Sequence, residues 1–153
     1  MDLNPRGLPE LEEWVVESDD FHLQGFMSAN VSVAQAVALA ALFRPGFVEF
    51  AGGVFLGFRF GRDGVDVWIE HLSGDLRAVE SVVNRIHLWD YFTPTSDAEY
   101  AALPALAEEV AAMWRGAARE AFPGRGFEVS VTGEPDAYGP TLTLVTLDDR
   151  DGR

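Results

Sequence analysis

The chain has 153 residues, which is the usual size of one domain with its own hydrophobic core. It contains 25 acidic and 11 basic residues, so its formal net charge is −14, and this excess argues against binding to nucleic acids or anionic membranes. Cysteine is absent, which excludes disulfides, thiol nucleophiles and cysteine-ligated metal sites.

The N-terminal sequence MDLNPRGLPELEEW has no basic region followed by an apolar one, so it does not have the pattern of a secretory signal. The longest apolar run, VAQAVALAALF at 33–43, has eleven residues. A membrane-spanning helix needs about 20. We therefore expect a soluble, cytoplasmic protein that binds neither nucleic acid nor membrane.

The first segments of the chain predict short elements. Residues 1–7 are expected to form a flexible tail. Residues 8–18 fit a short helix, because a proline suits its first turn and acidic residues favour its positive N-terminal end. Residues 20–27 are ambiguous between a short strand and an irregular crossing.

An alanine-rich helix is predicted next. Ser32 is suited to cap its N-terminus, and a proline–glycine pair stops it after Phe43. Its many alanines allow neighbouring elements to approach closely, so we expect this helix to be buried on most sides.

Residues 47–60 predict a β-hairpin, because two aromatic and β-branched runs flank a glycine pair. If Gly52 and Gly53 form a two-residue turn, Phe50 pairs with Phe55. Both faces of this hairpin are largely apolar. Either helices cover both faces, or one face is a docking surface for a partner.

The second half of the chain predicts three helices and a second hairpin. The helices are expected at 65–72, 76–89 and from Ser96 to about residue 121, and the hairpin spans 127–147.

The predicted class is therefore α+β. We expect one globular domain at 8–147 and a flexible acidic tail at 148–153. About four mostly antiparallel strands, in the hairpins 47–60 and 127–147, should pack against four to five helices. The two hairpins are expected to join into one sheet, because an isolated hairpin is marginally stable in water.

The stretch NRIHLWDYF at 84–92 is the main candidate for chemistry. On a continuous helix, Glu80, Asn84 and His87 would share one strip with Tyr91. A carboxylate, an amide and an imidazole could bind a metal or transfer protons, so an enzyme or metal site centred on Glu80, Asn84, His87 and Asp90 is one hypothesis. The strip has too few ligands for a stable zinc site. We therefore favour a structural corner, with no catalytic residue, metal or cofactor.

Acidic residues cluster between residues 10 and 20. This cluster is either a solvated helix face or a contact surface for a basic partner. The second interpretation gives a set of candidate protein-binding residues, in which acidic side chains attract the partner and aromatic side chains anchor it. The set consists of Glu12, Glu13, Glu17, Trp14, Phe50 and Phe55.

No phosphate-binding loop, nucleophile elbow or zinc-protease helix motif occurs in the sequence. We therefore expect a small acidic protein-binding module, such as an inhibitor or an immunity-type protein that neutralises a basic protein partner. The alternatives are the enzyme or metal site described above, and a structural homo-oligomer that pairs through the apolar hairpin.

Overall fold

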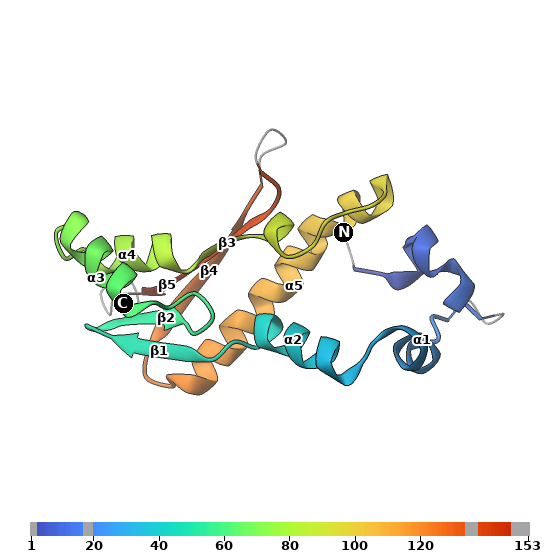
Figure 1. Cartoon of the computed structure of the whole chain (residues 1–153), viewed down its shortest axis with the longest axis horizontal. Coiled ribbons are helices and arrows are strands. Elements are labelled where there is room, and N and C mark those ends of the chain that lie inside the picture. Colours follow the sequence, from blue (N-terminus) through green and yellow to red (C-terminus); the bar gives the residue numbers. More distant parts are fainter. Residues whose placement is uncertain (1–2, 17–19, 134–137, 148–153) are drawn as a thin grey trace.

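The computed structural model describes residues 3–16, 20–133 and 138–147, and its elements alternate between helices and antiparallel strands. This confirms the predicted α+β class, with five strands in the described ranges where about four were expected. Figure 1 shows their arrangement. The elements are η1 (Pro5–Gly7), η2 (Pro9–Trp14), α1 (Leu23–Asn30), α2 (Val33–Phe43), β1 (Phe47–Phe50), β2 (Gly53–Leu56), α3 (Arg62–His71), α4 (Leu76–Val83), β3 (Arg85–His87), η3 (Leu88–Asp90), α5 (Asp97–Ala121), β4 (Gly126–Thr132) and β5 (Thr141–Leu147).

The predicted second hairpin is present as β4 and β5. The two strands pair antiparallel, with Val129 opposite Leu144, and β3 pairs with the other edge of β5. Apolar and polar residues alternate along β4, so Phe127 and Val129 are buried on one face of the sheet. The opposite face carries polar side chains.

Helix α5 covers the apolar face of this sheet (Figure 1). Ser96 caps the helix by accepting a hydrogen bond from the backbone N–H of Glu99, as the sequence predicts. The buried stripe of α5 packs against β4, β5 and Ile86 of β3 to form the main core. This stripe includes Leu103, Ala107, Val110, Ala111, Trp114 and Ala118.

The helix predicted at 76–89 ends earlier than its periodicity indicates. Helix α4 ends at Val83, and the chain continues as strand β3. Ile86 then lies opposite Leu142 of β5 and is buried in the main core. Pairing with the open edge of β5 outweighs the local helical pattern, which is the usual result when tertiary contacts compete with propensity.

The hairpin at 47–60 forms with its turn one residue earlier than predicted, which moves each pairing partner by two residues. Its turn is Ala51–Gly52, with positive φ angles of 52° and 87°, so Phe50 pairs with Gly53 and not with Phe55. Gly53 belongs to strand β2, where an added Cβ would lie 2.9 Å from the ring of Phe55. The need for space beside that ring explains why glycine occupies position 53 within the strand.

The two hairpins do not join into one sheet, contrary to the prediction. Strands β1 and β2 form a two-stranded sheet, whereas β3, β5 and β4 form a three-stranded one. Helices α3 and α4 cover one face of the smaller sheet, where Phe55 packs with Val65, Val79 and Val83 in a second apolar cluster. Val54 and Leu56 point the other way, into the main core.

The N-terminal elements lie at one end of the molecule, away from both sheets (Figure 1). Residues 8–18 were predicted as a helix, but among the residues of this range that the structure describes, 8–16, only the 3₁₀-helix η2 forms. Residues 20–27 were predicted as a short strand or an irregular crossing. Most of them instead belong to helix α1, which begins at Leu23. Residues 3–7 of the expected tail include the turn η1, and the expected C-terminal tail at 148–153 lies outside the described residues.

Helix α2 has the predicted bounds but not the predicted burial. Ser32 and Gln35 form a reciprocal capping box at its N-terminus. Leu42 is the buried residue of the helix, and the indole N–H of Trp114 donates a hydrogen bond to the carbonyl of Leu42 at 2.8 Å. Almost all of its other side chains are exposed, so only the C-terminal end of α2 is anchored in the core.

Candidate functional site

Glu80 and Asn84, the polar residues at the centre of the enzyme or metal hypothesis, connect the two sheets. Asn84 is fully buried, and its Oδ1 accepts from the N–H of Leu56 while its Nδ2 donates to the carbonyls of Val54 and Leu144. These bonds join the free edge of β2 to β5. The amide thus replaces the strand-to-strand hydrogen bonds that a continuous sheet would have made.

Glu80 lies one helical turn before Asn84 and does the same with its carboxylate. It is only 2% exposed and accepts from the N–H of Val54, the N–H of Thr146 and the Thr146 hydroxyl, all at 2.7–2.8 Å. Glu80 is thus bonded to three donors, and Asn84 to one donor and two acceptors, all within the fold. Their geometry supports a structural role for both.

His87 and Asp90 lie outside α4, so the predicted helical strip does not exist. The Nδ1 atom of His87 is 3.1 Å from the Thr141 hydroxyl, and its ring lies edge-on to Tyr138 at 5.6 Å. Asp90 is exposed, and its hydrogen bond to Tyr138 raises the pKa of that phenol above its usual value. Within the described ranges, no three His, Asp or Glu side chains come together as metal ligands.

The two phenylalanines predicted for docking pack inside the molecule. Phe55 is fully buried between β2 and helices α3 and α4, so it cannot contact a partner. Phe50 is half-buried, contacts Phe60 edge-on, and lies beneath the guanidinium of Arg62. Of the two arrangements that the sequence allowed, the covered hairpin is the one observed.

Two of the acidic candidate residues are described by the structure, and both are exposed beside α1. Glu12 and Glu13 lie on η2, and Glu13 accepts a hydrogen bond from the indole N–H of Trp14. Trp14 is half-buried and packs edge-on against Phe26 of α1, with ring centroids 5.8 Å apart. Glu17 lies outside the described residues. The acidic segment is therefore fixed next to α1 by an aromatic contact.

Helices α1 and α2 present exposed apolar side chains, although the sequence led us to expect α2 to be buried on most sides. Leu23 is 60% exposed on α1, while Val33 is 82% and Val37 is 64% exposed on α2. Met27 is also exposed, one turn after Leu23, just as Val37 follows Val33. We call these four side chains the α1–α2 surface. From Leu23 to Phe43 the sequence contains no charged residue.

An apolar groove lies beside the C-terminal half of α2. Ala38, Leu39 and Ala41 of α2 form one wall, and Phe58, Tyr91 and Phe92 form the other, around a volume of about 270 Å³. Exposed apolar side chains together with an apolar groove on a folded chain are typical of an interaction site. Sequence periodicity could not identify it, because a helix that is apolar on all sides gives no sign of which side is covered.

No single helix in the described ranges is long and apolar enough to cross a membrane. Helices α1 and α2 reach that length and composition only when taken together, and the chain bends by 112° between them. Comparison with known proteins gives no further guide, since no protein family, curated protein or solved structure matches this chain.

Proposed function

We propose that this protein is a protein-binding module that docks the α1–α2 surface onto an apolar patch of a basic protein. The observation that carries the proposal is the exposure of Val33 and Val37 on a helix anchored only at its far end. Exposed valine on a polar background needs no explanation, but an uncharged segment of 21 residues, 23–43, with several large exposed side chains does.

The charge distribution favours a basic partner over a second copy of the chain. Two copies would bring together net charges of −14 each, whereas a basic protein is attracted by the same field. Glu12 and Glu13, beside α1, supply negative charge at the margin of the apolar surface. Apolar contacts at the centre with charges around them are the usual arrangement of a protein interface. An inhibitor or immunity-type role, in which the acidic module neutralises a basic protein, is consistent with this arrangement.

The test compares two substitutions that differ only in where the new charge stands. Val37→Asp places a carboxylate in the middle of the α1–α2 surface. Val67→Asp is the matched control, because Val67 is 63% exposed on α3, away from this surface. The original chain and the two variants are each immobilised and used to capture proteins from the native lysate. Each captured protein is then purified, and its binding to the three chains is measured again in isolation.

The proposal requires a basic protein that rebinds the original chain and the Val67→Asp variant but not the Val37→Asp variant. Its association rate should fall as salt is raised, and should fall again when Glu12 and Glu13 are replaced by Gln. Two results would overturn the proposal. One is a homodimer, measured by light scattering, that Val37→Asp dissociates. The other is binding of the α1–α2 surface to zwitterionic lipid vesicles with no protein partner found.

A further inference from the structure

A second surface, unconnected with α1 and α2, lies on the uncovered face of the three-stranded sheet. The register aligns its side chains in rows across the strands: His87 of β3 lies opposite Thr141 of β5, which lies opposite Thr132 of β4. Arg85 and Thr143 make the next row together with Ser130. Because alternate residues face opposite sides of a strand, all these polar groups point away from α5.

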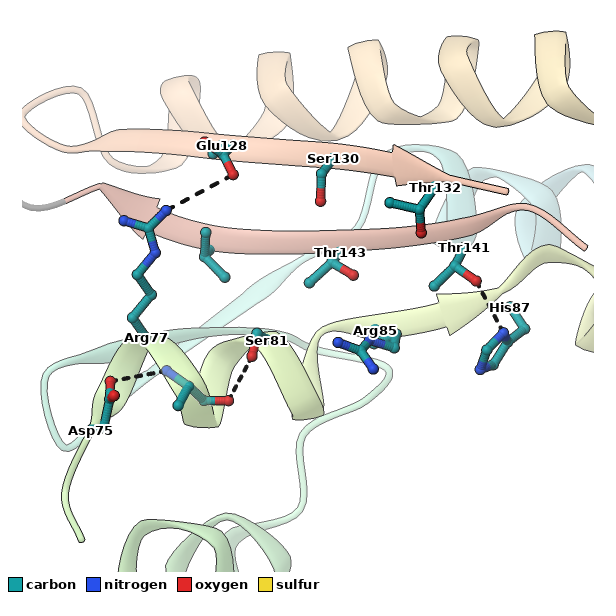
Figure 2. A pocket seen from close by; sticks show the side chains of 12 residues that line it. Asp75, Arg77, Ser81, Arg85, His87, Glu128, Ser130, Thr132, Thr141 and Thr143 are labelled. Carbon is teal, nitrogen blue, oxygen red and sulfur yellow. Dashed lines mark hydrogen bonds and ion pairs between the residues drawn. The ribbon is translucent and has the colours of Figure 1, made fainter. Parts of the chain in front are cut away.

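Helix α4 turns this polar face into a cleft. Ala78 and Ser81 of α4 line one side, and Arg77 and Asp75 lie towards its N-terminal end, around a volume of about 640 Å³. Figure 2 shows side chains from α4, β3, β5 and β4 around this space, with Arg85 between Ser81 and His87. A space of this size holds a small organic molecule.

The charges in the cleft differ from those of the rest of the protein. Asp75 is engaged as the cap of α4, accepting from the N–H of Ala78, and Glu128 forms an ion pair with Arg77 at 3.9 Å. The guanidinium of Arg85 makes no hydrogen bond or ion pair with any residue that the structure describes. The two arginines and two carboxylates that line the cleft therefore balance, in a chain whose net charge is −14, and the guanidinium of Arg85 is not paired with either carboxylate.

Several hydroxyl groups line the same cleft as this guanidinium. The side chains of Ser130, Thr132 and Thr143 have no hydrogen-bond partner in the described part of the chain, and each can rotate to donate its proton. Ser81 already donates to the carbonyl of Ala78, which leaves its oxygen able to accept. A guanidinium with several hydroxyl donors around it is suited to bind an oxyanion, because arginine can pair with two oxygens of a phosphate or carboxylate at once.

We propose that this cleft binds a small molecule through its phosphate or carboxylate group, with Arg85 pairing with the anion and Ser130 and Thr143 donating to it. Nucleic acid is not the expected ligand, since its long polyanionic backbone would be repelled by the surrounding acidic surface. A small anion avoids most of that repulsion because the cleft is locally close to neutral.

The experiment follows amide chemical shifts of the full chain by NMR while inorganic phosphate is added at constant ionic strength. Succinate is the carboxylate arm, and sodium chloride is the control for non-specific effects. We expect saturable shifts at Arg85, His87 and Thr143 with a dissociation constant on the order of millimolar. Saturation by phosphate alone or by succinate alone identifies which anion the site prefers.

Variants decide whether Arg85 is responsible. Arg85→Gln should weaken binding by at least about tenfold, because a charge-assisted pair is lost. Arg119→Gln is the matched control, since Arg119 is exposed on α5 and does not line the cleft. Thr143→Val keeps the shape of the side chain but removes one donor, and should weaken binding by a smaller factor. Shifts that do not saturate, that spread evenly over the surface, or that persist in Arg85→Gln would overturn the assignment.

Discussion

Asn84 is a small side chain with three buried hydrogen bonds, so its replacement should lower the stability of the fold by a large amount. Replacing Asn84 by Ala removes three buried hydrogen bonds and leaves the N–H of Leu56 and the carbonyls of Val54 and Leu144 without this partner. A hydrogen bond contributes about 1 kcal/mol net, and an unsatisfied buried group costs about 1–3 kcal/mol. We therefore expect the free energy of unfolding to fall by about 3–5 kcal/mol, a large part of the stability of a typical domain.

Asn84→Asp separates hydrogen-bond geometry from side-chain volume. The introduced carboxyl can still accept from Leu56, but it turns an oxygen towards two carbonyl oxygens, so it should be at least as destabilising as Ala at neutral pH. Burial and these carbonyls raise its pKa in the folded state, so the folded state binds more protons than the unfolded state does. Stability of this variant should therefore improve as pH is lowered towards about 4, where the protonated carboxyl can donate to one carbonyl.

Urea unfolding, followed by circular dichroism and repeated across pH, measures both effects. Asn30→Ala is the matched control, because Asn30 makes one exposed hydrogen bond to the carbonyl of Phe26 and should lose well under about 1 kcal/mol. The reasoning is refuted if Asn84→Ala costs no more than Asn30→Ala, or if Asn84→Asp shows the same pH dependence as the unmodified protein.

Three further predictions test other features by the same measurement. Glu80→Gln turns an NH₂ group towards donors that now bond to the carboxylate, so it should lower the free energy of unfolding by about 1–3 kcal/mol. Its control, Thr146→Val, removes only the hydroxyl bond and should cost about 1 kcal/mol. Equal losses would mean that the backbone bonds of Glu80 contribute little. Ala51→Gly relieves a positive φ of 52° and should stabilise the protein by about 0.5–1 kcal/mol. The same change in the middle of α5, Ala112→Gly, should destabilise it by about 1 kcal/mol. Stability changes of the same sign for both variants would contradict the turn assignment. Gly116→Ala should stabilise α5 by up to about 1 kcal/mol, because the new Cβ meets no atom within 4 Å, and a loss of stability would show that the space is filled.

Local patterns were enough to predict the elements that depend on local chemistry. The alternation in 127–132 and 141–147 predicted β4 and β5, and the serines at positions 32 and 96 predicted the starts of α2 and α5. Each of these signals arises from a short stretch that satisfies its own backbone or presents one clear apolar face. The α+β class followed from the order of these elements.

The predictions were wrong where contacts with a distant part of the chain determine the local structure. Residues 85–87 fit a helix by periodicity, but they become β3 because the edge of β5 is open and Asn84 is held between the sheets. The hairpin register depends on the space that Gly53 leaves for the ring of Phe55, which no pattern of glycines reveals. The missed strand also concealed the cleft, since Arg85 reaches the polar face of the sheet only when it belongs to β3.

The candidate surface on α2 was missed for a related reason, and its exposure predicts its dynamics. An isolated helix of eleven residues is marginal in water, and α2 is held by its capping box at one end and by Leu42 and Trp114 at the other. In the free protein, amides in the first two turns of α2 should therefore exchange with solvent much faster than those in the buried part of α5. Hydrogen exchange measured at low protein concentration tests this directly, and the proposed partner should slow exchange in α2 while leaving α3 unchanged. If α2 exchanges as slowly as α5 without a partner, then a contact within the chain or between copies already covers it, and the α1–α2 surface is not free to bind.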